Sequence, residues 1–428
     1  MLIEFSVGNF YSFKDIQTIS LNAANIVSKY PFVDQNNVFN HKGLKLLKSK
    51  AIYGANASGK SNLSRAFVSF VSIINESVKN DGLLEFRIFP FELSTETDSK
   101  PSFFQMVFSV NNVIYRYGFE ADRSKIHSEW LYGTPNKREV YFFRRKGKKI
   151  EINSNQFLEG HKIEQLLGKD SDVARPNSLF LTTVATLNGK LAKSIVDYLS
   201  GLVVITGLMD FELRRFAETA LQNDKVRARI AKMLKNADIG LEDINVLEIN
   251  QDNLGDDAPE ALMKKVRGGK KHNIVITDHM KYDKSGKKLG TFPMSLDIHE
   301  SEGTKKMFEI SPVLMDVLNN GKVLVFDEFD ARLHPLLTRK IVEMFNSKRT
   351  NKKNAQIIFA THDTNLLSAK LLRRDQISFV EKDKYGASHL YSLVDFKGVR
   401  NDSSFEKDYI QGKFGAIPFL GNLEEVFG

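Results

Sequence analysis

The segment that most constrains this chain covers residues 53–62 and reads YGANASGKSN. It fits the P-loop pattern G-x-x-x-x-G-K-[ST], in which glycines let backbone N–H groups close around phosphate oxygens, a lysine reaches the terminal phosphates and a hydroxyl binds Mg²⁺. Residues 46–53 have the pattern of a buried strand and residues 61–78 that of a helix, which is the context that the motif requires. The segment therefore predicts a nucleotide phosphate site, but it does not distinguish a GTPase, a kinase, a helicase and a transporter ATPase.

A second motif lies at residues 322–330, KVLVFDEFD, where an apolar run precedes Asp327 and Glu328. A buried strand that ends in two carboxylates suits the edge of a nucleotide-binding sheet. Asp327 would orient Mg²⁺ together with Ser61, and Glu328 would position or deprotonate the attacking water. The alternative is an acidic pair at the surface after a core strand. Because the acids lie so far along the chain from Lys60, a compact GTPase or small-molecule kinase is disfavoured and a split nucleotide domain is predicted.

Two further segments carry candidate site residues. Residues 355–367, AQIIFATHDTNLL, form the next strand pattern and place His362 at its end. A histidine there can hydrogen-bond the γ-phosphate or the attacking water, although many histidines at strand ends are structural. Upstream, residues 299–310, HESEGTKKMFEI, place Ser301 and Gly303 before a helix, where a hydroxyl and free N–H groups form an anion site or a simple N-cap.

The hydrophobic pattern changes character along the chain. Residues 1–30 alternate as strands do, residues 85–155 are rich in strand patterns, and residues 160–245 are helical. Residues 245–300 return to strands and basic turns, and the remainder of the chain alternates helix and strand. Such alternation predicts an α/β fold with a parallel sheet covered by helices.

Composition narrows the possible partners and compartments. The net charge of +9 is compatible with nucleic-acid contact, and basic turns at residues 144–149, 264–271 and 281–290 either line a phosphate backbone or are solvated hairpin tips. The absence of cysteine excludes disulfides and thiolate metal sites. The longest apolar run, residues 201–209, is too short to span a bilayer, and the N-terminal residues lack a signal-peptide pattern. We therefore expect a cytoplasmic protein without membrane contact.

Together these motifs resemble a known family. The P-loop, the signature-like SEGT, LVFDE, Asp330 in the following loop and the THD histidine occur in the order found in ABC-type ATPases. FDEFDARLHP and the split arrangement look like the SMC/RecF/OLD branch. Over nearly the whole chain, the segments MLIEFSVGNFYSF, GANASGKSNL, LHPLLTRKIVEMF, LLRRDQISFVEKD and YIQGKFGAIP resemble bacterial AAA/ABC-like ATPases of abortive infection and restriction-associated phage defence.

The resemblance implies a particular architecture. We expect an α/β fold in which a split ABC-type (SMC/RecF/OLD-like) P-loop ATPase head carries a β-rich lobe and a helical insert. Residues 1–160 would form the first ATPase lobe, with the P-loop and the β-rich subdomain. Residues 161–295 would form the helical and basic-hairpin insert, and residues 296–428 the second ATPase lobe, with the signature-like, Walker B and switch-histidine motifs.

The resemblance also implies roles for individual residues, with ATP and Mg²⁺ as cofactors. The nucleotide would be held by Gly54, Ala55, Asn56, Ala57, Ser58, Gly59, Lys60, Ser61 and Asn62. Asp327 would share the metal with Ser61, and Lys60, Glu328 and His362 would act in catalysis, Glu328 as the base and His362 as the switch histidine. Ser301 and Gly303 would reach the γ-phosphate of ATP held by a second protomer, and Asp330 would link the two sites.

Three features depart from the wider ABC pattern. SEGT lacks the full Leu-Ser-Gly-Gly-Gln, so the contact with a second protomer rests on fewer matching residues. Tyr11 stands where repair relatives often have arginine. Gln105 is the candidate for the glutamine loop, but its place in a strand pattern favours a half-buried strand residue.

The leading functional hypothesis is an ATPase, dimeric or of higher order, that acts as the sensor or regulatory subunit of a phage-defence system and controls a separate toxic effector encoded nearby. A nuclease within the chain is not expected, because few residues follow the candidate acids Glu381 and Asp383. The first alternative is a RecF/SMC-like DNA-binding ATPase of repair or maintenance, which the basic turns favour. A transporter ATPase is a weaker alternative, because the insert is large and the signature degenerate.

Overall fold

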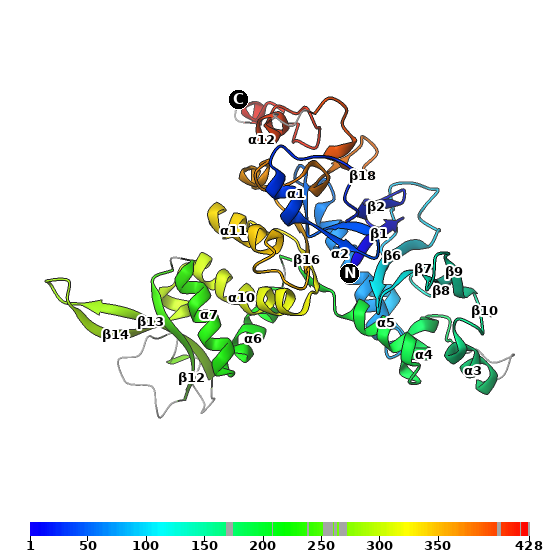
Figure 1. Cartoon of the computed structure of the whole chain (residues 1–428), viewed down its shortest axis with the longest axis horizontal. Helices are drawn as coiled ribbons and strands as arrows, with labels where there is room; N and C mark the ends of the chain where they lie inside the picture. Colours follow the sequence, from blue (N-terminus) through cyan, green and yellow to red (C-terminus); the bar gives the residue numbers. More distant parts are fainter. Residues whose placement is uncertain are drawn as a thin grey trace. The chain divides into compact units, whose positions relative to one another are not determined.

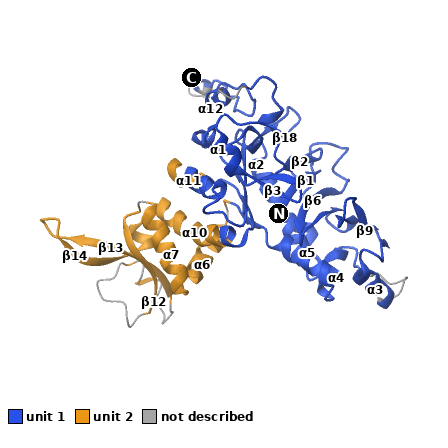
Figure 2. Ribbon diagram, viewed as in Figure 1, with its two compact units in different colours: residues 1–206, 317–329, 339–428 blue, residues 207–316, 330–338 orange. Residues whose placement is uncertain are grey.

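The chain folds into two compact units of mixed α/β structure, which confirms the predicted α/β class (Figure 2). The computed structural model describes residues 1–167, 174–207, 209–237, 239–250, 260, 263–264, 272–399, 404–419 and 421–426. The first unit comprises residues 1–206, 317–329 and 339–428, and the second comprises residues 207–316 and 330–338. The first unit therefore contains both the P-loop and the acidic pair.

A mainly parallel sheet forms one layer of the first unit, with strand order β11-β15-β16-β5-β17-β18. Its strands are β5 (Ser49–Tyr53), β11 (Val203–Ile205), β15 (Val323–Phe326), β16 (Gln356–Ala360), β17 (Ile377–Lys382) and β18 (Ser388–Ser392). All pairings are parallel except that of β17 with the edge strand β18. Every residue of β5, β15 and β16 is buried, as expected for strands covered on both faces.

A second, antiparallel sheet in the first unit has the order β10-β9-β8-β7-β6-β1-β2. Its strands are β1 (Leu2–Gly8), β2 (Gln17–Ser20), β6 (Ser102–Val110), β7 (Val113–Ala121), β8 (Ile126–Thr134), β9 (Val140–Lys146) and β10 (Lys149–Ile152). Buried and half-buried residues alternate along β6, as they do when one face of a sheet meets a core. The strand-rich pattern predicted for residues 85–155 is confirmed.

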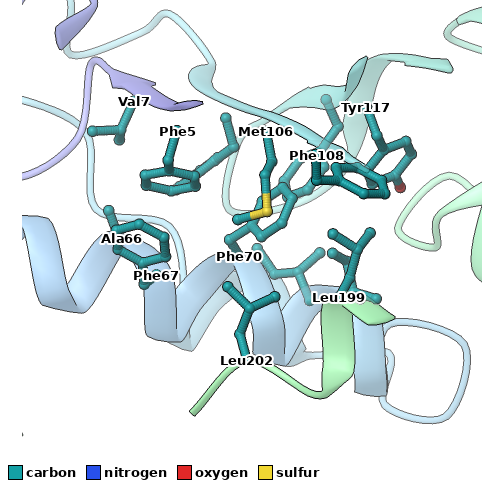
Figure 3. Packing of buried hydrophobic residues seen from close by; sticks show 14 of the residues in the cluster. Phe5, Val7, Ala66, Phe67, Phe70, Met106, Phe108, Tyr117, Leu199 and Leu202 are labelled. Atoms are coloured by element: carbon teal, nitrogen blue, oxygen red, sulfur yellow. The ribbon is translucent and has the colours of Figure 1, made fainter. Parts of the chain in front are cut away.

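Helix α2 (Lys60–Glu76), which begins within the P-loop motif, packs its apolar face against this second sheet (Figure 3). The ring of Phe67 stacks on Phe5 at 3.9 Å between centroids, and Phe70 stacks on Phe119 at 5.6 Å. Phe67 and Phe70 are three positions apart and therefore lie on the same face of the helix. The phosphate-binding helix and the β-rich lobe consequently share one hydrophobic core.

Smaller elements complete the first unit. They are α1 (Pro31–Asn37), β3 (Val38–His41), β4 (Leu44–Leu47), α3 (Leu158–Leu167), α4 (Phe180–Thr186), α5 (Lys190–Ser200), the greater part of α11 (Pro335–Asn346), α12 (Phe405–Ile410) and the 3₁₀ turns η1 (Leu83–Phe86), η2 (Thr364–Leu366), η3 (Arg374–Gln376), η4 (Leu393–Asp395) and η5 (Leu423–Val426). The buried Glu129 on β8 accepts hydrogen bonds from the Phe180 and Leu181 backbone nitrogens at 2.6 and 2.9 Å and therefore ties β8 to the start of α4.

The second unit combines helices with an antiparallel sheet of order β12-β13-β14 (Figure 1). Its elements are α6 (Asp210–Leu221), α7 (Asp224–Asn236), β12 (Leu241–Ile249), β13 (His272–Tyr282), β14 (Lys288–Ser295), α9 (Leu296–His299) and the first part of α10 (Glu302–Asn320). Asn223 caps α7 by accepting hydrogen bonds from the backbone nitrogens of Lys225 and Val226. The predicted change from helices to strands and basic turns is thus observed, with the first strand beginning at Leu241.

Candidate nucleotide site

The parallel sheet brings three of the predicted motifs to one edge. Strand β16 lies between β5 and β15, so the carboxyl ends of the three strands are neighbours. The Thr361 nitrogen donates to the Ile52 carbonyl at 3.1 Å, and the Phe329 nitrogen donates to the Ala360 carbonyl at 3.0 Å. The P-loop after β5, Asp327 and Glu328 after β15 and the segment with His362 after β16 therefore share the edge where α/β sheets bind ligands.

The P-loop itself has no room for side chains at its glycines. Gly59 has φ +114°, and a Cβ atom added there would lie 2.4 Å from the Ser388 Oγ. A Cβ atom at Gly54 would lie 2.4 Å from the Val380 carbonyl oxygen. The Lys60 Nζ donates hydrogen bonds to the Gly54 and Ala55 carbonyl oxygens at 2.8 and 2.9 Å, so the lysine side chain folds over the loop.

Two structural features of the loop fit the binding of a nucleoside triphosphate. Gly59 is the N-cap of α2 and has no side chain to accept hydrogen bonds from the first N–H groups of this 17-residue helix, which leaves its N-terminus suited to an anion. The Ser58 Oγ is buried and has no hydrogen-bond partner among the residues that the structure describes. Because buried polar atoms are normally paired, an unpaired hydroxyl in a phosphate loop is consistent with a bound polar group.

Two serines that the sequence did not single out support the loop from outside. The Ser388 hydroxyl lies 2.6 Å from the Ser58 carbonyl oxygen and 2.7 Å from the Ser12 hydroxyl. The Ser12 hydroxyl also accepts a hydrogen bond of 2.7 Å from the Asn62 side chain. Ser12 lies in the motif NFYSF, but the residue that this motif singled out was the neighbouring Tyr11.

Tyr11 has a packing role in this structure. Its backbone adopts φ +46°, and its ring stacks on Phe89 with 4.9 Å between centroids. The guanidinium of Arg65 lies 5.2 Å from the same ring centroid. Burial raises the pKa of Tyr11, so its hydroxyl stays protonated at neutral pH.

The two acids after β15 differ sharply in environment. Asp327 is buried, at 6% exposure, and its carboxylate accepts a hydrogen bond of 3.1 Å from the Glu328 nitrogen. Glu328 is exposed and adopts φ +52°, a left-handed conformation that is uncommon for residues with a side chain and that often marks functional positions. A buried acid beside an exposed one can serve as a metal ligand next to a general base.

His362, which follows β16, is also exposed. Asp363 beside it accepts a hydrogen bond from the Asn365 nitrogen.

Ser301, Gly303 and Asp330 belong to the second unit. The Ser301 Oγ accepts a hydrogen bond of 3.2 Å from the Thr304 nitrogen at the start of α10. A Cβ atom at Gly303 would lie 3.0 Å from the Arg332 carbonyl oxygen, so the segment that begins at Asp330 packs closely against the start of α10.

An ion-pair cluster that the sequence analysis missed reinforces this packing. Asp210 on α6 pairs with Lys306 on α10 at 3.1 Å and with Arg332 at 2.5 Å. Partial burial is the largest single effect on the pKa of Asp210 and raises it. The hydrogen bonds and charges of Arg332 and Lys306 together outweigh burial, so the pKa of Asp210 is lowered overall. Asp210 comes from a helix with no recognisable motif, so only its position in space reveals it.

The structure also places the remaining candidates. Gln105 lies in β6 as a half-buried strand residue whose side-chain oxygen accepts a hydrogen bond of 3.1 Å from Trp130. In the basic turn at 144–149, Arg145 is buried and Arg144 packs on the Tyr141 ring. Residues 281–290 form the tip of the β13–β14 hairpin. Of the basic turn predicted at 264–271, residues 265–271 lie outside the described residues.

A P-loop at the end of one parallel strand and an acidic pair at the end of another define the class of P-loop nucleoside triphosphatases. Residues 51–368, well over half of the chain, match the family described as "AAA domain, putative AbiEii toxin, Type IV TA system". The chain belongs to this family and is therefore a P-loop ATPase of the abortive-infection, toxin–antitoxin type. The resemblance to abortive-infection ATPases that the motifs indicated is thus confirmed. No curated protein matches the chain. No helix among the described residues is long and apolar enough to cross a bilayer.

Proposed function

We propose that this protein binds and hydrolyses ATP with Mg²⁺ and uses that cycle to regulate a separate toxic effector in defence against phage. The observation that carries the proposal is the meeting of the P-loop, Asp327 and Glu328 at one edge of a parallel sheet. Membership of a family named for a toxin–antitoxin system supports a partner of this kind.

In the proposed site, residues 54–62 hold the triphosphate of ATP, and the Lys60 ammonium would exchange its hydrogen bonds to the Gly54 and Ala55 carbonyl oxygens for contact with the terminal phosphates. Ser61 and Asp327 hold Mg²⁺, which neutralises charge on the phosphate oxygens. Glu328 accepts a proton from the attacking water, and its exposure leaves it accessible to that water. His362 hydrogen-bonds the γ-phosphate or the water.

The site is proposed to be completed by a second copy of the chain. Ser301 and Gly303 would contact the γ-phosphate of ATP bound by the partner, and Asp330 would link the two sites. The 19-residue helix α10 begins at Glu302, so its N-terminus offers N–H groups to an anion. This arrangement requires a dimer at least.

Ser301→Tyr is expected to impair hydrolysis without abolishing ATP binding to the monomer, because the ring would block the approach of the partner's nucleotide. Loss of one hydrogen bond to a charged group costs about 1.5–3 kcal/mol, which corresponds to roughly 10- to 150-fold in rate. Hydrolysis rates and a thermal-shift measurement with ATP test this expectation. Ser404→Tyr is the matched control, because Ser404 is also an exposed serine that caps a helix. Loss of nucleotide binding in Ser301→Tyr alone would contradict the proposed role.

A separate effector is proposed in preference to a nuclease within the chain. The Glu381 carboxylate accepts a hydrogen bond of 3.0 Å from the Tyr391 hydroxyl. The Asp383 carboxylate accepts hydrogen bonds from the Tyr385 and Ala387 nitrogens at 2.8 and 2.9 Å. Both acids thus have structural partners in the β17–β18 hairpin, which supports a structural role for them.

Phage plating tests the biological part of the proposal. Bacteria that carry the gene with its native neighbours should be protected, and Lys60→Ala should abolish protection, because a P-loop without its lysine loses its contact with the terminal phosphates. Lys79→Ala, at an exposed lysine beyond the end of α2, is the control and should protect as the wild type does. Absence of protection by the wild type against a broad phage panel would contradict the defence role.

A further inference from the structure

The β13–β14 hairpin extends beyond the rest of its sheet. Strand β12 pairs with β13 only as far as His279, whereas β13 continues to Tyr282 and β14 begins at Lys288. Every residue from 281 to 293 is exposed except the partly buried Asp283. This segment, here called the basic hairpin (residues 281–293), therefore has both faces exposed among the described residues of its own unit (Figure 1).

The turn of the basic hairpin is well defined. The Asp283 carboxylate accepts hydrogen bonds from the Ser285 and Lys287 nitrogens at 2.8 and 2.9 Å, and Gly286 adopts φ +81°. Hydrogen bonds from Ser285 and from the turn backbone lower the pKa of Asp283. The acid at the tip is thus used to shape the turn rather than to pair with a lysine.

Four lysines surround this turn: Lys281, Lys284, Lys287 and Lys288. In the part of the chain that the structure describes, no salt bridge joins any of them to an acid. Lys235 and, to a smaller extent, Lys288 lower the pKa of Glu242, but Glu242 is already paired with Lys235. The tip therefore presents a concentrated positive charge that suits a polyanion.

Aromatic rings are interleaved with these charges. The Lys281 Nζ lies 5.5 Å from the centroid of the Phe292 ring, and Tyr282 lies opposite Lys288 in the strand register. Tyr282 is 53% exposed and Phe292 is 48% exposed, fractions that leave much of each ring accessible. Because consecutive strand residues face opposite sides, each side of the hairpin carries a lysine beside an aromatic ring.

We propose that the basic hairpin binds single-stranded nucleic acid, with phosphates on the four lysines and bases stacked on Tyr282 and Phe292. Cations that follow the backbone together with exposed rings that stack on bases are the combination that binds single strands. In a duplex the base faces are already stacked, so the exposed rings favour a single strand. The assignment goes beyond the proposed ATPase function and does not depend on hydrolysis.

The test uses the full chain and fluorescein-labelled oligothymidylate and oligouridylate, with anisotropy read over a series of salt concentrations. Changing Lys281, Lys284, Lys287 and Lys288 to Glu should weaken binding at least tenfold and make the log–log salt slope shallower by about 0.7 for each lost phosphate contact. Changing the exposed residues Lys348, Arg349, Lys352 and Lys353 to Glu is the matched control and should change neither value appreciably. Preference for one oligonucleotide would assign the ligand to DNA or to RNA.

Removing the rings separates stacking from charge. Tyr282→Ala and Phe292→Ala should each weaken binding by roughly 5- to 150-fold, the range for loss of one stacked base, with the salt slope unchanged. Four results would overturn the proposal: no binding at low salt, equal loss in the control, tighter binding to a duplex, or equal binding to polyglutamate. The last result would assign the hairpin to an acidic protein instead.

Discussion

Glu328→Gln is expected to slow ATP hydrolysis by about 10²–10⁴-fold while ATP binding is retained, because the amide keeps the shape of the side chain but cannot accept a proton. Glu328 is exposed at the end of β15, and the adjacent Asp327 is buried. The assay is phosphate release under saturating ATP, with nucleotide-dependent thermal stabilisation as the measure of binding.

Glu85→Gln provides the control, because Glu85 is an exposed glutamate in η1 away from the proposed site residues. Hydrolysis by Glu328→Gln at the wild-type rate would show that another group takes the proton. The slow variant should also accumulate as an ATP-dependent dimer in size-exclusion chromatography. A size distribution that is the same with and without ATP would contradict the composite site. It would not affect the assignment of Glu328 as the general base.

Glu129→Ala is expected to destabilise the first unit by about 3–5 kcal/mol, the cost of breaking a buried ion pair by removing one partner. The Glu129 side chain is fully buried and lies 3.7 Å from the buried Arg145 guanidinium. It also accepts hydrogen bonds from the Tyr117 hydroxyl at 3.0 Å and from the first N–H groups of α4. Alanine would leave the Tyr117 hydroxyl and these N–H groups of α4 without their acceptor and would remove the only carboxylate paired with Arg145 among the described residues, although that guanidinium also donates to backbone carbonyl oxygens.

Glu139→Ala is the matched control, because Glu139 lies just before β9 and pairs with a residue of β7 in the same sheet. Glu139 pairs with Arg116 at 2.7 Å, but both side chains are substantially exposed, so its loss should cost less than about 1 kcal/mol. Urea unfolding followed by the fluorescence of Trp130, the single tryptophan of the chain, reports on this sheet directly, since Trp130 lies on β8 beside Glu129. Equal midpoints for the two variants would mean that the buried pair contributes little.

Much of the candidate site could be predicted from sequence because its chemistry is encoded locally. The P-loop needs glycines, a lysine and a hydroxyl at fixed spacing between a strand and a helix, and β5 and α2 appear where the pattern places them. The same applies to β15, whose apolar run ends just before Asp327. Alternation of helix and strand was enough to predict the parallel sheet, since strands buried on both faces are continuously apolar.

The sequence by itself determined the P-loop, the acidic pair and the ATPase family, because each depends on residues that are close together in the chain. Only the tertiary structure decided which residues far apart in the chain lie together. Ser12 and Ser388 meet at the P-loop, and Asp210 meets Arg332 in the second unit. Serine and aspartate are common residues with no local pattern of their own at these positions. Their roles arise from packing between elements far apart in sequence, which no local periodicity can report.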